Sequence, residues 1–254
     1  MPAMIKGNQP TDNGNFLFSD DDRDELLRKE PKAEQFIRRV ISAHAFINGK
    51  NRWCLWLKDV SPSGWRCLPE IVKRVEFVKE FRLKSTKAVT VKLAEVPYLF
   101  AEIRQPESDY VLIPRHSSEN RKYVPIAFFN KDVIVSDSCI AVPNATLYHF
   151  GLLTSTMHMA WMRVVCGRLE GRYRYSNNIV YNNFPFPDDV NDKQRAKVEE
   201  KSQAVLAARE PFPVATLADL YDPFAMPKEL LTAHRELDEA AERLLPAGIV
   251  PKRA

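Results

Sequence analysis

The chain has 254 residues, of which 45% are hydrophobic, and it carries 37 basic and 33 acidic side chains. That length allows one large domain or two modest ones with a buried core. No apolar run approaches the roughly 18 residues that a membrane span requires. The polar N-terminus also lacks the apolar stretch of a signal peptide. We therefore expect no membrane partner and a cytoplasmic location.

The four cysteines do not indicate a metal site or a disulfide framework. No two of them form a CxxC pair, and none has histidines at metal-ligand spacing. Disulfides are also rare in a cytoplasmic chain of this size. We expect four ordinary thiols, no metal and no cofactor bound by this chain itself.

The net charge of +4 conceals an uneven distribution of charged residues. Residues 19–38 and 188–254 are net acidic, and three stretches between them are basic. Residues 66–92 hold eight bases against three acids, whereas 115–131 and 163–174 each hold four bases against one acid. Three basic stretches could converge on a polyanion such as nucleic acid. The same charges could equally cover solvated helix faces.

The N-terminal segment, residues 1–18, is polar and rich in turn formers, which is typical of a linker. Ser19 with the acidic residues behind it predicts the start of a helix. That helix is expected to end near Pro31, and Pro31 can open a second helix through about Ile41.

Strand and helix signals alternate in the middle of the chain. The apolar and aromatic run WCLWL, residues 53–57, predicts a buried strand. Apolar residues at helical spacing predict a helix over 68–81, with a buried side formed by Ile71, Val75, Val78 and Phe81. Residues 98–142 predict a β-rich region with strands at 110–113, 124–129, 133–135 and 140–142.

Helices dominate the predicted C-terminal third. One long apolar helix, capped by Asn144 or Thr146, is expected to run to about Arg168. Charged helices are expected over 188–210 and 227–245, joined by a proline-containing connection.

These elements predict an α+β fold with three segments. Residues 1–18 are expected to be a linker, and 19–187 a mixed β-rich domain with packed helices. Residues 188–254 are expected to form a C-terminal helical region.

The chain lacks the sequence motifs of an independent enzyme. A methyltransferase that uses S-adenosylmethionine needs a glycine-containing loop, and an adenine-N6 enzyme needs an NPPY-like tetrapeptide; neither is present. There is no GxGxxG, Walker or HExxH motif, and three histidines, His116, His149 and His158, fall in different predicted elements. The run Asn183-Phe184-Pro185 has one proline where two are needed, so we interpret it as a rigid turn. We expect no catalytic site in this chain.

The most informative segment is GRLEGRYRYS, which carries alternating charged and aromatic residues. On an extended segment Glu170, Arg172 and Arg174 would share one face, with Tyr173 and Tyr175 on the other. Arginine donates two hydrogen bonds to guanine, and glutamate accepts one from cytosine. A carboxylate would repel phosphates, so Glu170 favours base reading. The alternative is an exposed strand with a local ion pair that contributes little to stability.

Several blocks of the chain resemble the MmeI-like enzymes, large single-chain proteins that join a nuclease, an adenine-N6 methyltransferase and a recognition domain. The similar blocks occur in the same order: AEQFIRRVISAHAFINGKNRWCLWL, PRHSSENRKYVPIAFF, MHMAWMRVVCGRLEGRYRYS, YNNFPFP and LADLYDPFAMPKELLTAHRELDEA. The resemblance implies a sequence-specific double-stranded DNA recognition module of an adenine-N6 DNA methyltransferase or type II restriction–modification enzyme. The methyltransferase domain, with its S-adenosylmethionine, would be supplied upstream, in cis or from a split gene.

The resemblance also implies which residues read bases. Glu170 and Arg172 are similar to the pair that reads the base pair beside the methylated adenine, where they would favour cytosine on the modified strand. Arg174 resembles the reader on the other side of that adenine, with a partner near Ser138.

Further DNA contacts are expected outside this segment. A loop that resembles a DNA-contacting loop of the family contains Arg115, Ser117, Ser118, Arg121 and Tyr123. Other candidate contacts are Lys84, Ser85, Lys87 and Arg168; for the lysines, plain solvent exposure is the alternative. The competing function is a protein–protein interaction subunit that reads no bases. DNA affinity should fall steeply with salt, and an apolar protein interface should be far less sensitive.

Overall fold

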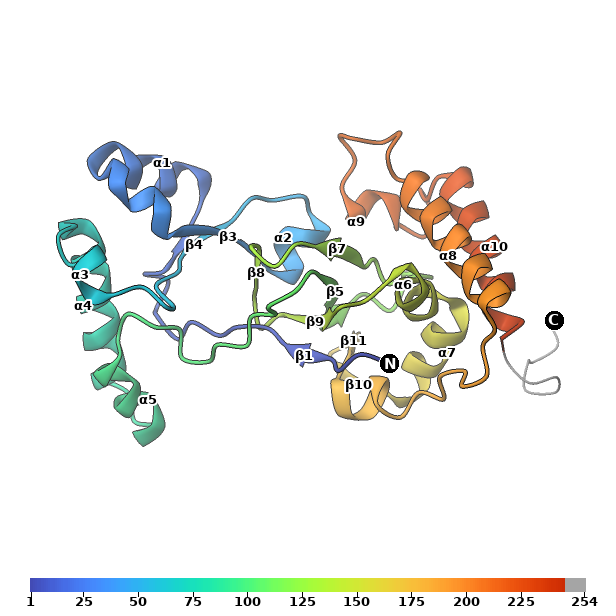
Figure 1. The fold of residues 1–254 in the computed structure, drawn as a ribbon, viewed down its shortest axis with the longest axis horizontal. Helices are drawn as coiled ribbons and strands as arrows, with labels where there is room; N and C mark the ends of the chain where they lie inside the picture. Colours follow the sequence, from blue (N-terminus) through green and yellow to red (C-terminus); the bar gives the residue numbers. More distant parts are fainter. Residues whose placement is uncertain (245–254) are drawn as a thin grey trace.

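The computed structural model describes residues 1–244 and shows an α+β fold, as the sequence predicts (Figure 1). The strands are β1 (Ile5–Lys6), β2 (Leu17–Phe18), β3 (Ile37–Ile41), β4 (Trp53–Leu55), β5 (Tyr110–Pro114), β6 (His116–Ser117), β7 (Ala127–Phe129), β8 (Ile134–Val135), β9 (Cys139–Pro143), β10 (Gly167–Leu169) and β11 (Arg172–Arg174). The α-helices are α1 (Asp20–Lys29), α2 (Ala43–Ile47), α3 (Pro62–Trp65), α4 (Pro69–Leu83), α5 (Ala88–Lys92), α6 (Leu147–Thr154), α7 (Thr156–Val165), α8 (Asp192–Ala207), α9 (Leu217–Leu220) and α10 (Lys228–Glu242). The short turns are the 3₁₀ segments η1 (Pro31–Phe36) and η2 (Leu93–Glu95) and the π-helical η3 (Asn177–Tyr181).

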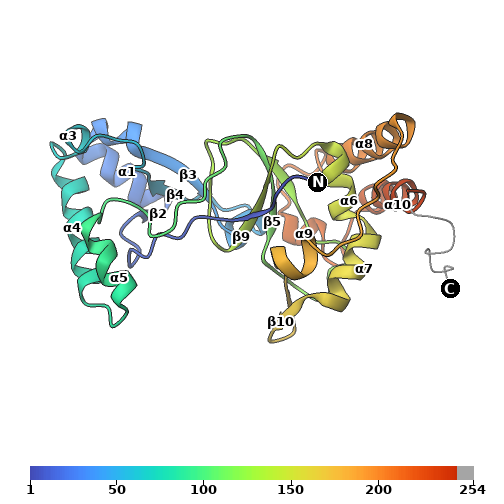
Figure 2. The same ribbon diagram turned by 60° about the horizontal axis from the view of Figure 1, so that its bottom comes forward.

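The molecule is elongated, with three parts along its long axis (Figure 1). The first lobe surrounds the sheet β2–β4–β3–β8, and the sheet β1–β9–β5–β7 forms the centre. At the other end α8 packs against both α6 and α10. The third sheet, β10–β11–β6, carries a hairpin that projects from the centre toward the bottom of Figure 2. Within residues 1–244, no helix has the length and hydropathy that crossing a bilayer requires.

The buried cores follow this division only in part. The first lobe has its own core, in which Phe16 and Phe18 are fully buried. A second core joins Phe150 on α6 with Val198 on α8 and Leu237 on α10. The boundary that we predict near residue 187 therefore does not separate two cores, because the C-terminal helices bury their apolar faces against the β-rich part.

The prediction of a linker over residues 1–18 is wrong, because this segment is packed into two sheets. Strand β1 pairs with β9, and β2 pairs with β4. The Asn8 side chain is buried and donates a hydrogen bond to Oε1 of Gln105 (2.8 Å). The turn formers in the segment produce local turns. Phe16 and Phe18, which follow them, are fully buried and hold the segment in place.

Two predicted helices also differ from the observed elements. After Pro31 the chain forms only the turn η1 and then strand β3, whose β-branched residues pair with β4 and β8. The long helix expected from Thr146 is divided in two at Ser155, which has an extended backbone (ψ 154°). The Ser155 side chain accepts a hydrogen bond from the amide of His158 and so caps α7.

Candidate nucleic-acid interface

The segment with the candidate base readers folds as a β-hairpin of β10 and β11, and β6 adds a third strand to it. The register pairs Gly167 with Arg174, and Leu169 with Arg172. On the other side of β11, Arg174 pairs with His116. Directly opposite residues of an antiparallel sheet carry their side chains on the same face. Arg172, Arg174 and His116 therefore share one face, which we call the reading face.

The opposite face of the hairpin is buried. Arg172 and Arg174 are exposed, whereas Tyr173 and Tyr175 are only 6% and 3% exposed. The Tyr175 hydroxyl forms a hydrogen bond of 2.7 Å with Nε2 of His158 on α7. This confirms the predicted alternation of arginines and tyrosines, and it shows that the tyrosines fix the hairpin to the protein.

Glu170 does not follow that alternation. It lies in the turn of the hairpin with φ at +56°, so it is not part of either extended strand. Its carboxylate still accepts a hydrogen bond from Nη2 of Arg172 at 2.6 Å, with the two side chains 77% and 50% exposed. An ion pair this exposed contributes little to stability. It does hold an acceptor and several donors side by side at the tip of the hairpin.

Arg168 points away from the reading face, because it pairs with buried Tyr173. Its guanidinium lies 4.1 Å from the centre of the Tyr173 ring and donates to the carbonyl oxygen of Gly171 (3.2 Å). These contacts stabilise the hairpin, although the side chain remains exposed.

The structure brings Arg115 and Ser138 next to the hairpin. The Arg115 carbonyl accepts from the amide of Tyr175 (2.8 Å), and its amide donates to the carbonyl of Ser138 (3.0 Å). The Ser138 hydroxyl accepts from the amide of Ala43 at the start of α2 (3.0 Å). Ser138 is thus close to the reading face through its backbone, while its side chain is engaged elsewhere in the protein.

Two residues of the predicted DNA-contacting loop face inward, which corrects the prediction for both. Ser117 is 5% exposed and pairs with buried Tyr173, and Tyr123 is 1% exposed. The Tyr123 hydroxyl donates to Oδ2 of Asp238 on α10 (2.7 Å). Their neighbours Ser118 and Arg121 are half-buried. Only some of the polar side chains of this loop are therefore accessible to a ligand.

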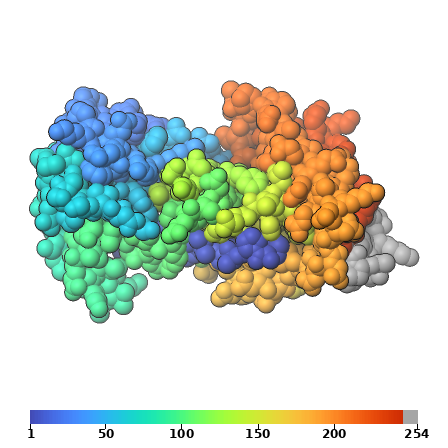
Figure 3. All heavy atoms as spheres, viewed as in Figure 1, coloured from blue at the N-terminus to red at the C-terminus, as the bar shows by residue number. Residues whose placement is uncertain are grey.

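The lysines predicted to contact phosphates belong to the first lobe. Lys84 and Lys87 are exposed and Ser85 half-buried at the corner between α4 and α5. They do not adjoin the hairpin. In both ribbon views, however, this corner and the β10 turn project toward the same side (Figure 1, Figure 2). The space-filling view shows the outline indented between these two projections (Figure 3).

Two residues of the reading face are absent from the sequence-based prediction. His116 lies opposite Arg174, and Leu169, which is 46% exposed, lies opposite Arg172. Burial lowers the pKa of His116 from its usual value, and the neighbouring Arg115, Arg174 and Arg172 lower it further. For Leu169 the sequence held a signal, because an apolar residue stands alone among polar residues in this segment. The position of His116 could not be read from the sequence, because it depends on the long-range pairing of β6 with β11.

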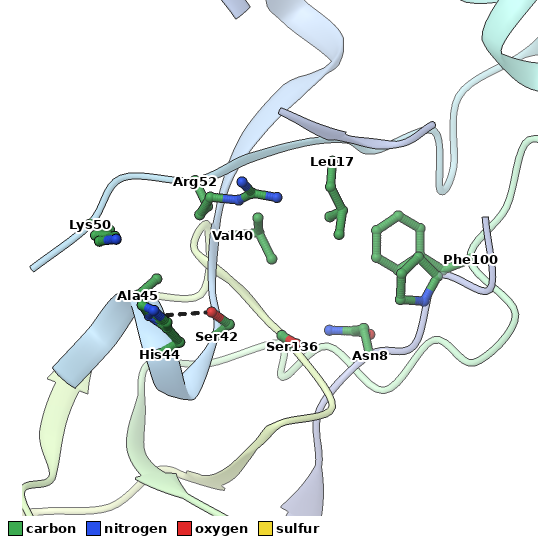
Figure 4. A pocket seen from close by; sticks show the side chains of 11 residues that line it. Asn8, Leu17, Val40, Ser42, His44, Ala45, Lys50, Arg52, Phe100 and Ser136 are labelled. Carbon is green, nitrogen blue, oxygen red and sulfur yellow. Dashed lines mark hydrogen bonds between the residues drawn. The ribbon is translucent and has the colours of Figure 1, made fainter. Parts of the chain in front are cut away.

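A separate pocket of about 290 Å³ lies between the first lobe and α2 (Figure 4). Its lining includes the cations Lys50 and Arg52 and the polar residues Asn8 and Ser42. Asn8 is hydrogen-bonded to Gln105, and Ser42 accepts from the amide of Ala45. Because these polar groups are already engaged, the reading face is the better candidate site. Residues 1–244 contain no group of three or more side chains that could hold a metal ion.

Comparisons with known proteins identify the family to which the chain belongs. Residues 1–188 match the family described as the MmeI target recognition domain, and residues 190–250 match the MmeI C-terminal domain. DNA methyltransferase A of Bacillus subtilis (strain 168) is 36% identical over 243 residues, which are 96% of this chain and 27% of that protein.

A solved structure gives a similar result. The type IIL restriction–modification enzyme MmeI, in complex with DNA, superimposes with a TM-score of 0.94 at 47% identity. The match covers 96% of this chain and 32% of the MmeI chain, so this chain spans about a third or less of these relatives. The chain belongs to the MmeI family, as a target recognition domain followed by an MmeI C-terminal domain.

Proposed function

We propose that this chain is the sequence-reading module of an adenine-N6 DNA methyltransferase or restriction–modification enzyme. The observation that carries the proposal is the projecting hairpin, which exposes Arg172 and Arg174 on one face and anchors the other face with buried tyrosines. Support also comes from the relatives, one named as a DNA methyltransferase and one solved with DNA. The reading face would lie against base edges in the major groove, which admits a two-stranded β-ribbon.

The Glu170–Arg172 pair suits a C·G base pair. In the major groove guanine presents the acceptors O6 and N7, and cytosine presents its N4 amino donor. The arginine supplies donors and the glutamate an acceptor, held 2.6 Å apart by their own ion pair. The acceptor and the donors therefore lie next to each other on the hairpin, as reading both bases of one pair requires.

Affinity would come from phosphate contacts by basic residues away from the hairpin. Lys84 and Lys87 are exposed on a corner that projects to the same side as the β10 turn, so one long duplex could touch both. Such contacts position the duplex without reading sequence.

The chemistry would take place in a methyltransferase domain with S-adenosylmethionine, in cis or from a split gene, in the cytoplasm. Adenine-N6 chemistry requires the target base to be flipped out of the duplex. The role of this chain would be to hold the duplex so that one particular adenine meets that domain.

Replacing Arg172 tests the proposal. Arg172→Ala should cost roughly 1–3 kcal/mol on the preferred site and relax one base position, because the donors to guanine are lost. The measurement is selection of bound duplexes from a randomised library, with the chain joined to a methyltransferase domain. Lys32→Ala is the matched control, since it removes an exposed positive charge from the first lobe. If Arg172→Ala leaves the selected sequence unchanged, the reading face does not read bases.

The alternative is a protein–protein interaction subunit whose aromatic segments bind a partner chain. The aromatic residues in and after the hairpin do not support it, because Tyr173, Tyr175, Tyr181 and Phe184 are all buried. Salt titration separates the two functions, because contacts with phosphates weaken steeply as salt rises.

A further inference from the structure

We propose that His116 is a further specificity-determining residue, which contacts a base edge from β6 beside Arg174. This inference rests on the proposed function and adds a third strand to the part of the hairpin that reads DNA. It follows from strand pairing, because the resemblance that marks Arg115 and Ser117 as part of a DNA-contacting loop did not select His116 between them.

The register places the two side chains close together on one face. The hydrogen bond from the amide of Tyr175 to the carbonyl of Arg115 marks that pair as hydrogen-bonded. The next pair along the strands, Arg174 with His116, is therefore of the non-hydrogen-bonded type. Cα atoms in such pairs are about 4.5 Å apart, closer than in the hydrogen-bonded type. The imidazole therefore lies beside the Arg174 side chain, within reach of a ligand bound next to Arg174.

The imidazole is partly sheltered and has no partner in the protein. His116 is half-buried, and among the described residues nothing forms a hydrogen bond with its ring. The buried histidines, by contrast, are bonded to tyrosine hydroxyls: His158 to Tyr175 and His234 to Tyr221. An unpartnered polar ring on a face shared with two exposed arginines is free to bind an external group.

The chemistry of the ring complements that of the arginines. Burial and the charges of Arg115, Arg174 and Arg172 lower the pKa of His116, so the ring is neutral at neutral pH. A neutral imidazole has one donor and one acceptor, whereas a guanidinium has only donors. His116 can therefore donate to N7 of a purine or accept from the amino group of cytosine or adenine. Its base should lie in the pair read by Arg174 or in an adjacent pair.

The test compares duplexes selected from a randomised library by the chain joined to a methyltransferase domain. His116→Ala should reduce the preference at one base position by about threefold to tenfold, the value of one hydrogen bond. That position should be the one relaxed by Arg174→Ala or its immediate neighbour. His116→Gln retains a donor and an acceptor, so it should change the preferred base without abolishing the preference. His44→Ala, which removes an exposed histidine on α2, is the matched control.

The outcomes separate this inference from the proposed function. If Arg172→Ala relaxes a position but both His116 variants select the wild-type sequence, the inference is wrong and the proposed function stands. If the His116 variants lose affinity equally for all sequences, with a shallower salt dependence, His116 contacts a phosphate. That result would also overturn the inference. If neither Arg172→Ala nor the His116 variants alter selection, the proposed function itself fails. Melting temperatures of all variants identify any that do not fold.

Discussion

Arg82 is the most unusual single residue of the first lobe. Its side chain is fully buried at the C-terminal end of α4, where the helical pattern favoured Phe81 as the apolar contact and Phe81 is instead 38% exposed. The guanidinium donates to backbone carbonyls of two separate segments, those of Pro10, Thr11, Leu93, Val96 and Leu99. Arg82 therefore ties the N-terminal segment and the turn after α5 to α4.

Replacing Arg82 should be costly even when the charge is kept. Arg82→Lys cannot reproduce the fork of donors, and it leaves buried carbonyls without partners. A buried carbonyl left without a partner costs about 1–3 kcal/mol, so we expect at least such a loss in the free energy of unfolding, measured by urea denaturation. Arg66→Lys, at an exposed arginine of the same lobe, is the control and should change stability little. Equal stability of the two variants would contradict this role.

The residues predicted to contact DNA show the same dependence on surroundings at the residue scale. The alternation of Arg172, Tyr173 and Arg174 was predictable because it follows from strand geometry alone. The burial of Tyr123 was not, because it results from Asp238 lying more than a hundred positions later in the sequence.

At the scale of elements, the contact of α6 with α8 and α10 depends on a glycine. A Cβ atom at Gly151 would collide with Oγ of Ser202, would lie 2.6 Å from Cγ1 of Val198, and would lie 3.2 Å from Cδ1 of Leu237. The absence of a side chain at this position lets α6 approach the two C-terminal helices closely.

Gly151→Ala should therefore destabilise this helix packing. A new methyl group in a filled core forces the helices apart, and the usual cost of such overpacking is about 1–3 kcal/mol. Thermal or urea unfolding measures it. Gly167→Ala is the control, because a Cβ there meets nothing within 4 Å and its backbone needs no left-handed conformation. If both variants unfold alike, the close approach at Gly151 is not important.

At the scale of the whole molecule, one buried polar network connects the C-terminal helices to the reading face. Asp238 on α10 accepts from the Tyr123 hydroxyl and from the amide of Thr156, each at 2.7 Å. Tyr123 lies in the loop that follows β6, and Thr156 begins the helix that leads into β10. One carboxylate on α10 thus holds both segments that flank the hairpin. This contact links the C-terminal helices to the β-rich part, with which they share a core.

Buried histidines should make the stability of the whole molecule dependent on pH. Burial lowers the pKa of His158 to about 3, and it lowers that of His234 well below the usual value of 6.5. The free energy of unfolding is therefore at its full value above pH 6.5. It decreases as the pH falls, because the two histidines then bind protons only in the unfolded chain. We expect each histidine to remove about 1.4 kcal/mol per pH unit below that value.

Unfolding free energies measured by urea denaturation between pH 7.5 and 5 test this, since most carboxylates remain ionised over that interval. A His158→Gln variant should show a shallower slope than the wild type. A flat profile for the wild-type protein would show that the histidines are accessible to protons in the folded state.

The sequence by itself determined those features that depend on neighbours along the chain. The capped helix after Ser19, the helix over α4 and the alternation of arginines and tyrosines over residues 172–175 each follow from local spacing and capping. The tertiary structure alone decided that residues 1–18 are part of the fold, that Tyr123 is buried and that His116 joins the reading face. Each of these depends on pairing between segments distant in the sequence, and such pairing is selected by the burial of whole surfaces, which no local pattern records.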